Sequence, residues 1–175
     1  MREGEVLGLC RSAIDFENGQ IKVERQLQLF QGQYVFMPPK NGKPRTITPA
    51  PFVMDLLREE LRAQAEARLK AGVLWNNQEG FLFTDAQGQH LKRQTVYRHF
   101  KQAVAAIGLP HVRFHDLRHS YAVASIRAGD DVKTVSENLG HASVAFTLDV
   151  YGHVTGDMKK ASADKMQRYI DALQA

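Results

Sequence analysis

The segment His-Asp-Leu-Arg-His at residues 115–119 brings together side chains whose spacing could support chemistry. On a helix, residues three and four apart are neighbours, so His115, Arg118 and His119 would share one face. Two histidines four residues apart can hold a metal ion, whereas a histidine and an arginine three residues apart can hold a phosphate. The segment by itself leaves both kinds of site open, and a purely structural role for His119 as well.

The neighbouring residues favour the phosphate. A zinc site needs three or four ligands, and Asp116 stands where metalloprotease helices carry a glutamate, with no further ligand evident. The guanidinium of Arg118 offers a planar fork of donors that suits two phosphate oxygens, and it does not lose its charge. We therefore favour an anion site near the start of a helix, although an H-x-x-R pattern alone is short and arises by chance.

The composition is that of an ordinary folded protein with a mild basic excess. The 175 residues are 43% hydrophobic and 24% charged, with a net charge of +4 and a pI near 9.3. These values argue against a disordered chain and permit a polyanionic partner. No run of residues approaches a membrane span, and the first ten residues do not form a signal peptide. One cysteine, Cys10, excludes a disulfide framework, and a reducing cytosol is the expected setting.

The elements that must position these residues are mainly helices. Apolar residues recur at three- and four-residue spacings in the helical segments, and Asn18-Gly19 predicts a hairpin turn. Gly140 and an aspartate at 130 or 131 predict the two ends of one short helix. We predict a single α+β domain with helices at 3–9, 51–71, 93–107, 115–128, 132–139, 142–151 and 157–173, a small antiparallel sheet within 14–29, 33–39 and 45–49, and a short strand at 81–84.

Four more segments accompany the H-x-x-R box in a familiar order. The chain opens with Arg2 in R-E-G-E-V-L-G-L and continues with P-K-N-G-K-P-R-T-I at 39–47. After the H-x-x-R box come L-G-H at 139–141 and Tyr151 in Y-G-H-V. The sequence resembles the catalytic domain of the tyrosine recombinases, specifically the integrases of phages and integrative elements. Each motif is weak alone, but five in register over nearly the whole chain are specific.

The resemblance implies a role for each matched side chain. Six residues would converge on one phosphodiester: Arg2, Lys40, His115, Arg118, His141 and Tyr151. The two arginines would bind the non-bridging oxygens, the first histidine would help to accept the tyrosine proton, and the second would donate a hydrogen bond or position the nucleophile. The lysine would protonate the leaving 5′-oxygen while the tyrosine attacks phosphorus. No metal or cofactor is implied, because arginines supply the positive charge.

The resemblance also implies double-stranded DNA with attachment sites as the partner. Basic residues gather in the loop after residue 39 and at the start of the predicted helix at 93, where they would meet phosphates and groove edges. The predicted DNA-contacting residues are Lys43, Arg45, Lys92, Arg93, Thr95 and Arg98. Lys43 is also the alternative to Lys40 as the general acid, and Glu5 would orient its neighbours without reacting. A solvated basic helix is the plainer interpretation of the second group.

Members of the family carry an N-terminal arm and a core-binding domain, which we expect to be absent here. The sequence would then be a catalytic domain truncated at its N-terminus, with a core over 1–156 and a C-terminal helix over 157–175 that packs on a neighbouring protomer. It would act in the cytoplasm, at the nucleoid, as a bacterial or phage-encoded protein without membrane contact. The alternatives are a non-catalytic DNA-binding or oligomerisation fragment of such a recombinase, a metal-dependent hydrolase and a type IB topoisomerase.

Overall fold

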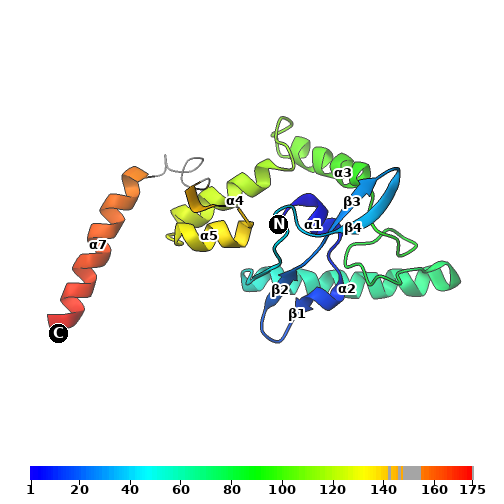
Figure 1. Cartoon of the computed structure of the whole chain (residues 1–175), viewed down its shortest axis with the longest axis horizontal. Coiled ribbons are helices and arrows are strands. Elements are labelled where there is room, and N and C mark those ends of the chain that lie inside the picture. Colours follow the sequence, from blue (N-terminus) through cyan, green and yellow to red (C-terminus); the bar gives the residue numbers. More distant parts are fainter. Residues whose placement is uncertain (142, 146, 148–154, 175) are drawn as a thin grey trace. The chain divides into compact units, whose positions relative to one another are not determined.

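The structure, a computed structural model, describes residues 1–141, 143–145, 147 and 155–174. The chain separates into two compact units, Met1–Asp116 and Leu117–Ala175, and each is described by itself. The predicted class, mainly helical α+β with its strands near the N-terminus, is confirmed (Figure 1). No helix in the described part of the chain is both long and apolar enough to cross a bilayer.

The first unit contains a short helix, two small sheets and two longer helices. Its elements are α1 (Glu3–Leu7), η1 (Arg11–Ala13), β1 (Ile14–Asp15), β2 (Gln20–Val23), β3 (Gln26–Phe30), β4 (Gln33–Met37), β5 (Arg45–Ile47), α2 (Pro51–Ala71), η2 (Gly72–Leu74) and α3 (Arg93–Ala106). The helices predicted at 3–9, 51–71 and 93–107 are confirmed to within two residues at each end.

The strands form two antiparallel sheets, whereas the sequence predicted one. β2 lies between β1 and β5, and β3 pairs with β4. The predicted turn at Asn18-Gly19 joins β1 to β2. Pro38, Pro39 and Pro44 lie in the loop between β4 and β5 and lack the N–H group that a ladder requires, so neither strand extends into this loop. The chain leaves β4 and returns beside β2.

The short strand predicted at 81–84 is wrong. Phe81 and Thr84 make isolated bridges, to Cys10 and His90 respectively, instead of a continuous ladder. The chain turns immediately afterwards, because the carboxylate of Asp85 accepts backbone hydrogen bonds from the turn that follows it. Too few residues remain extended for a strand.

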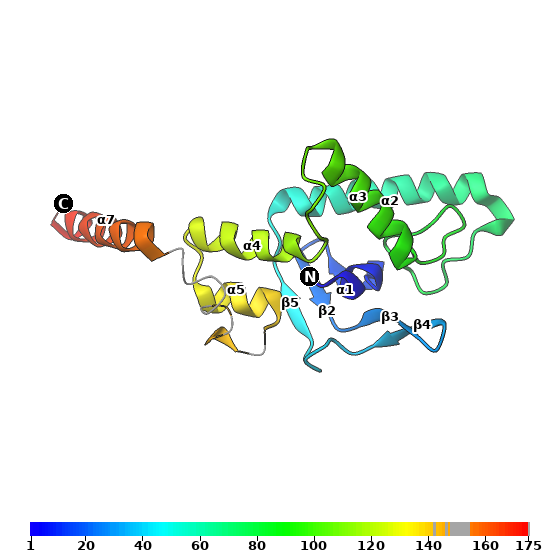
Figure 2. The same ribbon diagram turned by 90° about the horizontal axis from the view of Figure 1, so that it is seen from above.

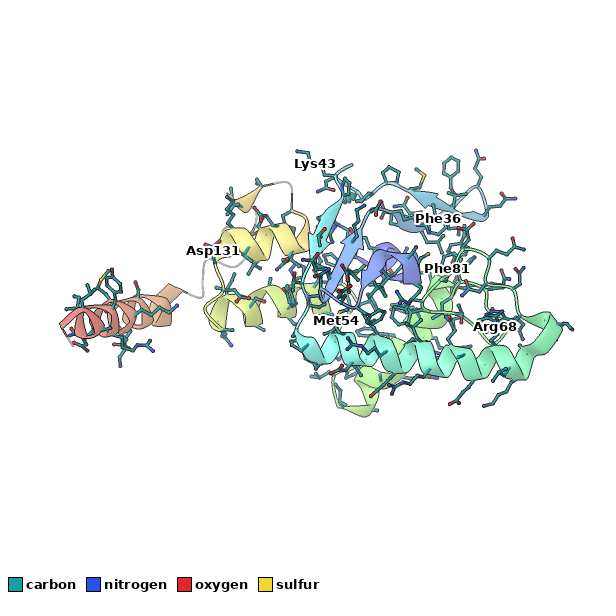
Figure 3. The ribbon with its side chains drawn as sticks, turned by 90° about the horizontal axis from the view of Figure 1, so that it is seen from below. Phe36, Lys43, Met54, Arg68, Phe81 and Asp131 are labelled. Carbon is teal, nitrogen blue, oxygen red and sulfur yellow. The ribbon has the colours of Figure 1, made fainter. Side chains whose placement is uncertain are left out.

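The core of the first unit lies between the β1-β2-β5 sheet and α2 (Figure 3). Its buried side chains are Leu9, Ile14, Ile21, Val23, Met54, Leu57 and Leu82. Leu56 and Leu69 of α2 are 54% and 84% exposed, so they lie outside this core although they are apolar. A second cluster joins α1 to β3 through Leu7 and Leu27, and Phe36 stacks on Phe81 beside it at 5.5 Å between ring centres.

The second unit contains α5 (Val132–Leu139), α7 (Thr155–Gln174) and all of α4 (Asp116–Arg127) except its first residue. α4 and α5 lie side by side (Figures 1 and 2) and bury Ala122, Ile126, Val135 and Leu139 between them. The ends of α5 are as predicted: Asp131 accepts a hydrogen bond from the N–H of Thr134 at 3.0 Å, and Gly140 has a left-handed φ of +64°. Apart from 143–145 and 147, the helix predicted at 142–151 lies outside the described residues, as does Tyr151.

Candidate active site

The candidate site in the first unit is built around a buried carboxylate. Glu5 is 1% exposed, and both of its oxygens accept hydrogen bonds from arginines. Arg45 forms a bidentate pair, with Nη1 at 3.0 Å from Oε1 and Nη2 at 2.7 Å from Oε2. Arg2 donates its backbone N–H to Oε2 at 2.7 Å, and its Nη1 lies 3.3 Å from Oε1. Glu5 therefore holds Arg2 by its main chain and by its side chain.

The charge of this group follows from the balance of burial and pairing. Burial alone would raise the pKa of Glu5, but hydrogen bonds from Arg45 and from the N–H of Arg2, together with the two positive charges, lower its pKa to about 2. The carboxylate is thus ionised at neutral pH. Two guanidiniums and one carboxylate leave the group with one net positive charge, which suits an anionic ligand.

Two glycines explain how α1 can present Arg2 at this position. A Cβ atom on Gly4 would lie 2.8 Å from the carbonyl oxygen of Leu27, and one on Gly8 would lie 2.8 Å from the Leu27 nitrogen. The helix therefore packs with its backbone directly against β3, and any larger side chain would push it away. The R-E-G-E-V-L-G-L motif thus combines the arginine, its carboxylate partner and the two glycines that seat the helix.

Lys40 and Lys43 occupy one tight loop between β4 and β5, and both are exposed. The N–H of Gly42 donates to the carbonyl of Pro39 at 2.7 Å, which closes a turn around Lys40. The N–H of Lys43 donates to the side chain of Asn41 at 3.2 Å, and Figure 3 shows Lys43 at the outer edge of the unit. Both lysines therefore remain candidates for the general acid.

In the second unit, a hydrogen bond joins the H-x-x-R and L-G-H boxes. Arg118 is 8% exposed and lies on the buried face of α4, in line with Ala122 and Ser125. Its Nη2 donates to the carbonyl oxygen of Leu139, the last residue of α5. Because helix C-terminal carbonyls carry partial negative charge, they are suitable partners for a guanidinium. His115, the first residue of the H-x-x-R box, belongs to the first unit; it is exposed and directly precedes α4 in the sequence.

The left-handed turn at Gly140 places His141 immediately after α5. The N–H of His141 donates to the carbonyl of Ser136 at 3.0 Å, and its Nδ1 lies 2.7 Å from Oγ1 of Thr147. Thr147 is fully buried, so this hydrogen bond fixes the orientation of the imidazole ring. Thr147 was not among the residues predicted from the sequence. The sequence does show a hydroxyl side chain within the apolar segment before Tyr151, and this was the one indication of a polar contact there.

The residues predicted to contact DNA differ in their surroundings. Lys92, Arg93 and Arg98 are exposed at the first turns of α3, and Thr95 is half-buried there. The Nε of Arg93 lies 3.1 Å from a carboxylate oxygen of Glu3, which links α3 to α1. The side chain of Arg45 is only 10% exposed, because it is engaged with Glu5.

For the metal alternative at His115 and His119, the structure provides no supporting cluster. Within residues 1–141 and the other described segments, no group of three or more His, Cys, Asp or Glu side chains could hold a metal ion. Arg2, Lys40 and His115 belong to the first unit, and Arg118 and His141 belong to the second.

The structure places the R-E-G-E-V-L-G-L, H-x-x-R and L-G-H motifs on a mainly helical α+β fold, as the resemblance to the tyrosine-recombinase catalytic domain predicts. The Phage integrase family matches residues 1–157, and the chain belongs to this family. It is 29% identical, over 95% of its length, to a XerC-like tyrosine recombinase of Caldanaerobacter subterraneus. It is 30% identical, again over 95% of its length, to the ICEBs1 integrase of Bacillus subtilis. It spans 46% and 45% of the lengths of these relatives.

Solved structures share the fold. The integrase of transposon Tn1549, in complex with transposon right-end DNA, matches 95% of this chain with a TM-score of 0.75 and 24% identity, over 55% of its own chain. The XerH site-specific recombinase, bound to its palindromic difH substrate, matches 95% with a TM-score of 0.64 and 25% identity, over 42% of its own chain. The comparisons therefore confirm the fold class and the family predicted from the sequence.

Proposed function

We propose that this chain cleaves and rejoins DNA strands in the site-specific recombination of a mobile element. The observation that carries the proposal is the ordered set of six residues in a chain of the Phage integrase family: Arg2, Lys40, His115, Arg118, His141 and Tyr151. The relatives include an integrase and a XerC-like recombinase, and structural neighbours were solved bound to DNA. The protein would act in the bacterial cytoplasm, at the nucleoid.

The proposed reaction is a phosphoryl transfer that conserves the bond. The phenol oxygen of Tyr151 attacks phosphorus while the bond from phosphorus to the 5′-oxygen breaks, which leaves a 3′-phosphotyrosine and a free 5′-hydroxyl. His115 accepts the phenol proton, and Lys40 supplies a proton to the leaving oxygen. Attack by the 5′-hydroxyl of another strand reverses the step and releases the tyrosine.

Cations are central to this mechanism. A tyrosine hydroxyl with a reference pKa of about 10 is almost entirely protonated at neutral pH. Arg2 and Arg118 would stabilise the charge that builds on the non-bridging oxygens in the transition state, and His141 would add a hydrogen bond. Arginine charge takes the place that metal ions fill in many nucleases, so no cofactor belongs to the proposal.

DNA binding would involve two exposed basic regions. The first turns of α3 carry Lys92, Arg93, Thr95 and Arg98, and the β4–β5 loop carries Lys43. Helix α7 has exposed apolar side chains at Met166, Tyr169, Ile170 and Leu173. We propose that this stripe packs on a neighbouring protomer when copies assemble on DNA.

The test is covalent trapping on a suicide DNA substrate, whose nicked strand releases a short fragment and prevents religation. We expect an adduct that migrates as protein plus DNA, and Tyr151→Phe should abolish it while the matched Tyr97→Phe leaves it intact. An adduct that persists in Tyr151→Phe would overturn the nucleophile assignment. Salt-dependent binding without any adduct would favour the alternative of a non-catalytic DNA-binding fragment.

A further inference from the structure

The carboxylate of Glu5 accepts hydrogen bonds from two arginines. Each oxygen accepts two hydrogen bonds, one from Arg45 and one from Arg2, at 2.7 to 3.3 Å. A carboxylate has about four lone-pair sites, so its capacity is filled. Arg45 contributes the bidentate half of this arrangement from β5, forty residues away in the sequence.

We propose that Arg45 is a positioning residue for Arg2, acting through the buried Glu5, and not a residue that contacts DNA. The inference rests on the proposed function for its catalytic consequence, but the positioning itself concerns the chain alone. Arg45 would hold the carboxylate in place and ionised, and the carboxylate would in turn hold the main chain and side chain of Arg2.

Charge balance explains why two arginines are needed. If Glu5 were paired with Arg2 alone, the pair would be neutral and would offer a phosphate little attraction. Arg45 supplies the second positive charge, so the two guanidiniums and the carboxylate together keep one net positive charge that can attract a phosphate. Its own side chain is 10% exposed, compared with 22% for Arg2, so it is the less accessible of the two.

The structure also holds Arg45 firmly. It pairs with Val23 in the β2–β5 ladder, and Val23 belongs to the core beneath that sheet. Arg45 therefore connects the first turn of α1 to the β1-β2-β5 sheet through the buried carboxylate of Glu5.

The first experiment needs no DNA. In isotope-labelled protein, we would measure the heteronuclear NOE of the Arg2 amide and titrate the Glu5 carboxyl carbon. Arg45→Gln, which removes the charge but keeps a donor, should loosen the Arg2 amide and shift the Glu5 midpoint upward by at least about one pH unit. Arg25→Met, which removes an arginine that does not bond to Glu5, should change neither.

Arg45→Met serves as a second variant without any donor and should show larger effects than Arg45→Gln. The signals of Val23 and Leu27 report whether each variant is folded. A folded variant of Arg45 in which the Arg2 amide and the Glu5 midpoint match the wild type would overturn the proposal. The result does not depend on whether the chain cleaves DNA.

The second experiment tests the catalytic consequence with single-turnover cleavage. A methylphosphonate at the scissile position replaces one charged oxygen by a methyl group, so less positive charge is needed at that oxygen. Arg45→Gln should slow cleavage of ordinary DNA about tenfold or more and cleavage of the methylphosphonate much less, with partial recovery in Arg45→Lys. Equal slowing on both substrates would indicate a merely structural role. A wild-type chain that forms no adduct would contradict the proposed function, while the NMR result still decides the positioning.

Discussion

The buried carboxylate of Glu5 should make the free energy of unfolding depend on pH. Its pKa is lowered to about 2, below the ordinary value of 4.5, so its contribution to folding is fully present above pH 4.5 and is lost as the pH falls toward 2. Between pH 6 and pH 3, we expect the free energy of unfolding to fall by roughly 2 kcal/mol through this group. Urea unfolding at the two pH values should show a smaller drop in Glu5→Gln, while Glu59→Gln, an exposed control on α2, should behave as the wild type.

The two lysines of the β4–β5 loop can be separated by the chemistry of the leaving group. A 5′-bridging sulfur leaves without protonation because a thiolate is far more stable than an alkoxide. If Lys40 is the general acid, Lys40→Ala should cleave ordinary DNA about 100-fold more slowly than the wild type but cleave the sulfur substrate at nearly its rate. Lys43→Ala is the matched control. If Lys43→Ala, and not Lys40→Ala, is slow on ordinary DNA but cleaves the sulfur substrate at nearly the wild-type rate, Lys43 is the general acid.

The hydrogen bond between Thr147 and His141 predicts an effect of a buried hydroxyl on the reaction rate. Thr147→Val keeps the shape of the side chain and removes the partner of Nδ1, so the imidazole loses its fixed orientation. We expect adduct formation to slow about three- to tenfold, in the range of one lost hydrogen bond. Thr147→Ser retains the hydroxyl and should recover most of the rate; equal defects in both variants would point to packing instead.

At the scale of elements, α1 depends on the absence of side chains at its contact with β3. Gly8 has a negative φ, so an alanine there is not strained by its backbone, but its Cβ would lie 2.8 Å from the Leu27 nitrogen. We expect Gly8→Ala to cost about 2 kcal/mol or more by overpacking. Gly32→Ala has open space around it and a φ of +81°, so only backbone strain of about 1 kcal/mol opposes it. Chemical denaturation would measure the loss in the free energy of unfolding for each variant. The loss should be larger for Gly8→Ala; a smaller loss there would show that α1 shifts to make room for the Cβ atom.

The element boundaries were predicted where a local cause determines them. Asp131 and Gly140 bound α5 because a capping carboxylate and a left-handed turn act within a few residues. The division of the strands into two sheets was not predicted, because pairing partners are chosen between distant segments. The prolines between β4 and β5 are visible in the sequence, but they do not indicate that β5 pairs with β2, because this pairing depends on how distant segments pack.

At the scale of the whole molecule, DNA binding should depend on the basic residues of α3. Each phosphate contact releases counterions, so affinity should fall linearly with salt on a logarithmic plot. Lys92→Ala and Arg98→Ala should each reduce the slope by about one, whereas Lys70→Ala, exposed at the far end of α2, should leave it unchanged. Fluorescence anisotropy over a salt series would measure the slopes. Unchanged slopes in both α3 variants would remove this helix from the proposed DNA interface.

The sequence by itself determined the family, the mainly helical class and the six candidate catalytic residues, because these depend on residue types, spacing and order along the chain. Only the tertiary structure decided that Arg45 faces Glu5, that Arg118 bonds to the end of α5, and that Thr147 orients His141. Such partners are brought together by packing between segments up to forty residues apart. Local periodicity carries no information about them, because it records which face of an element is buried and not what lies against it.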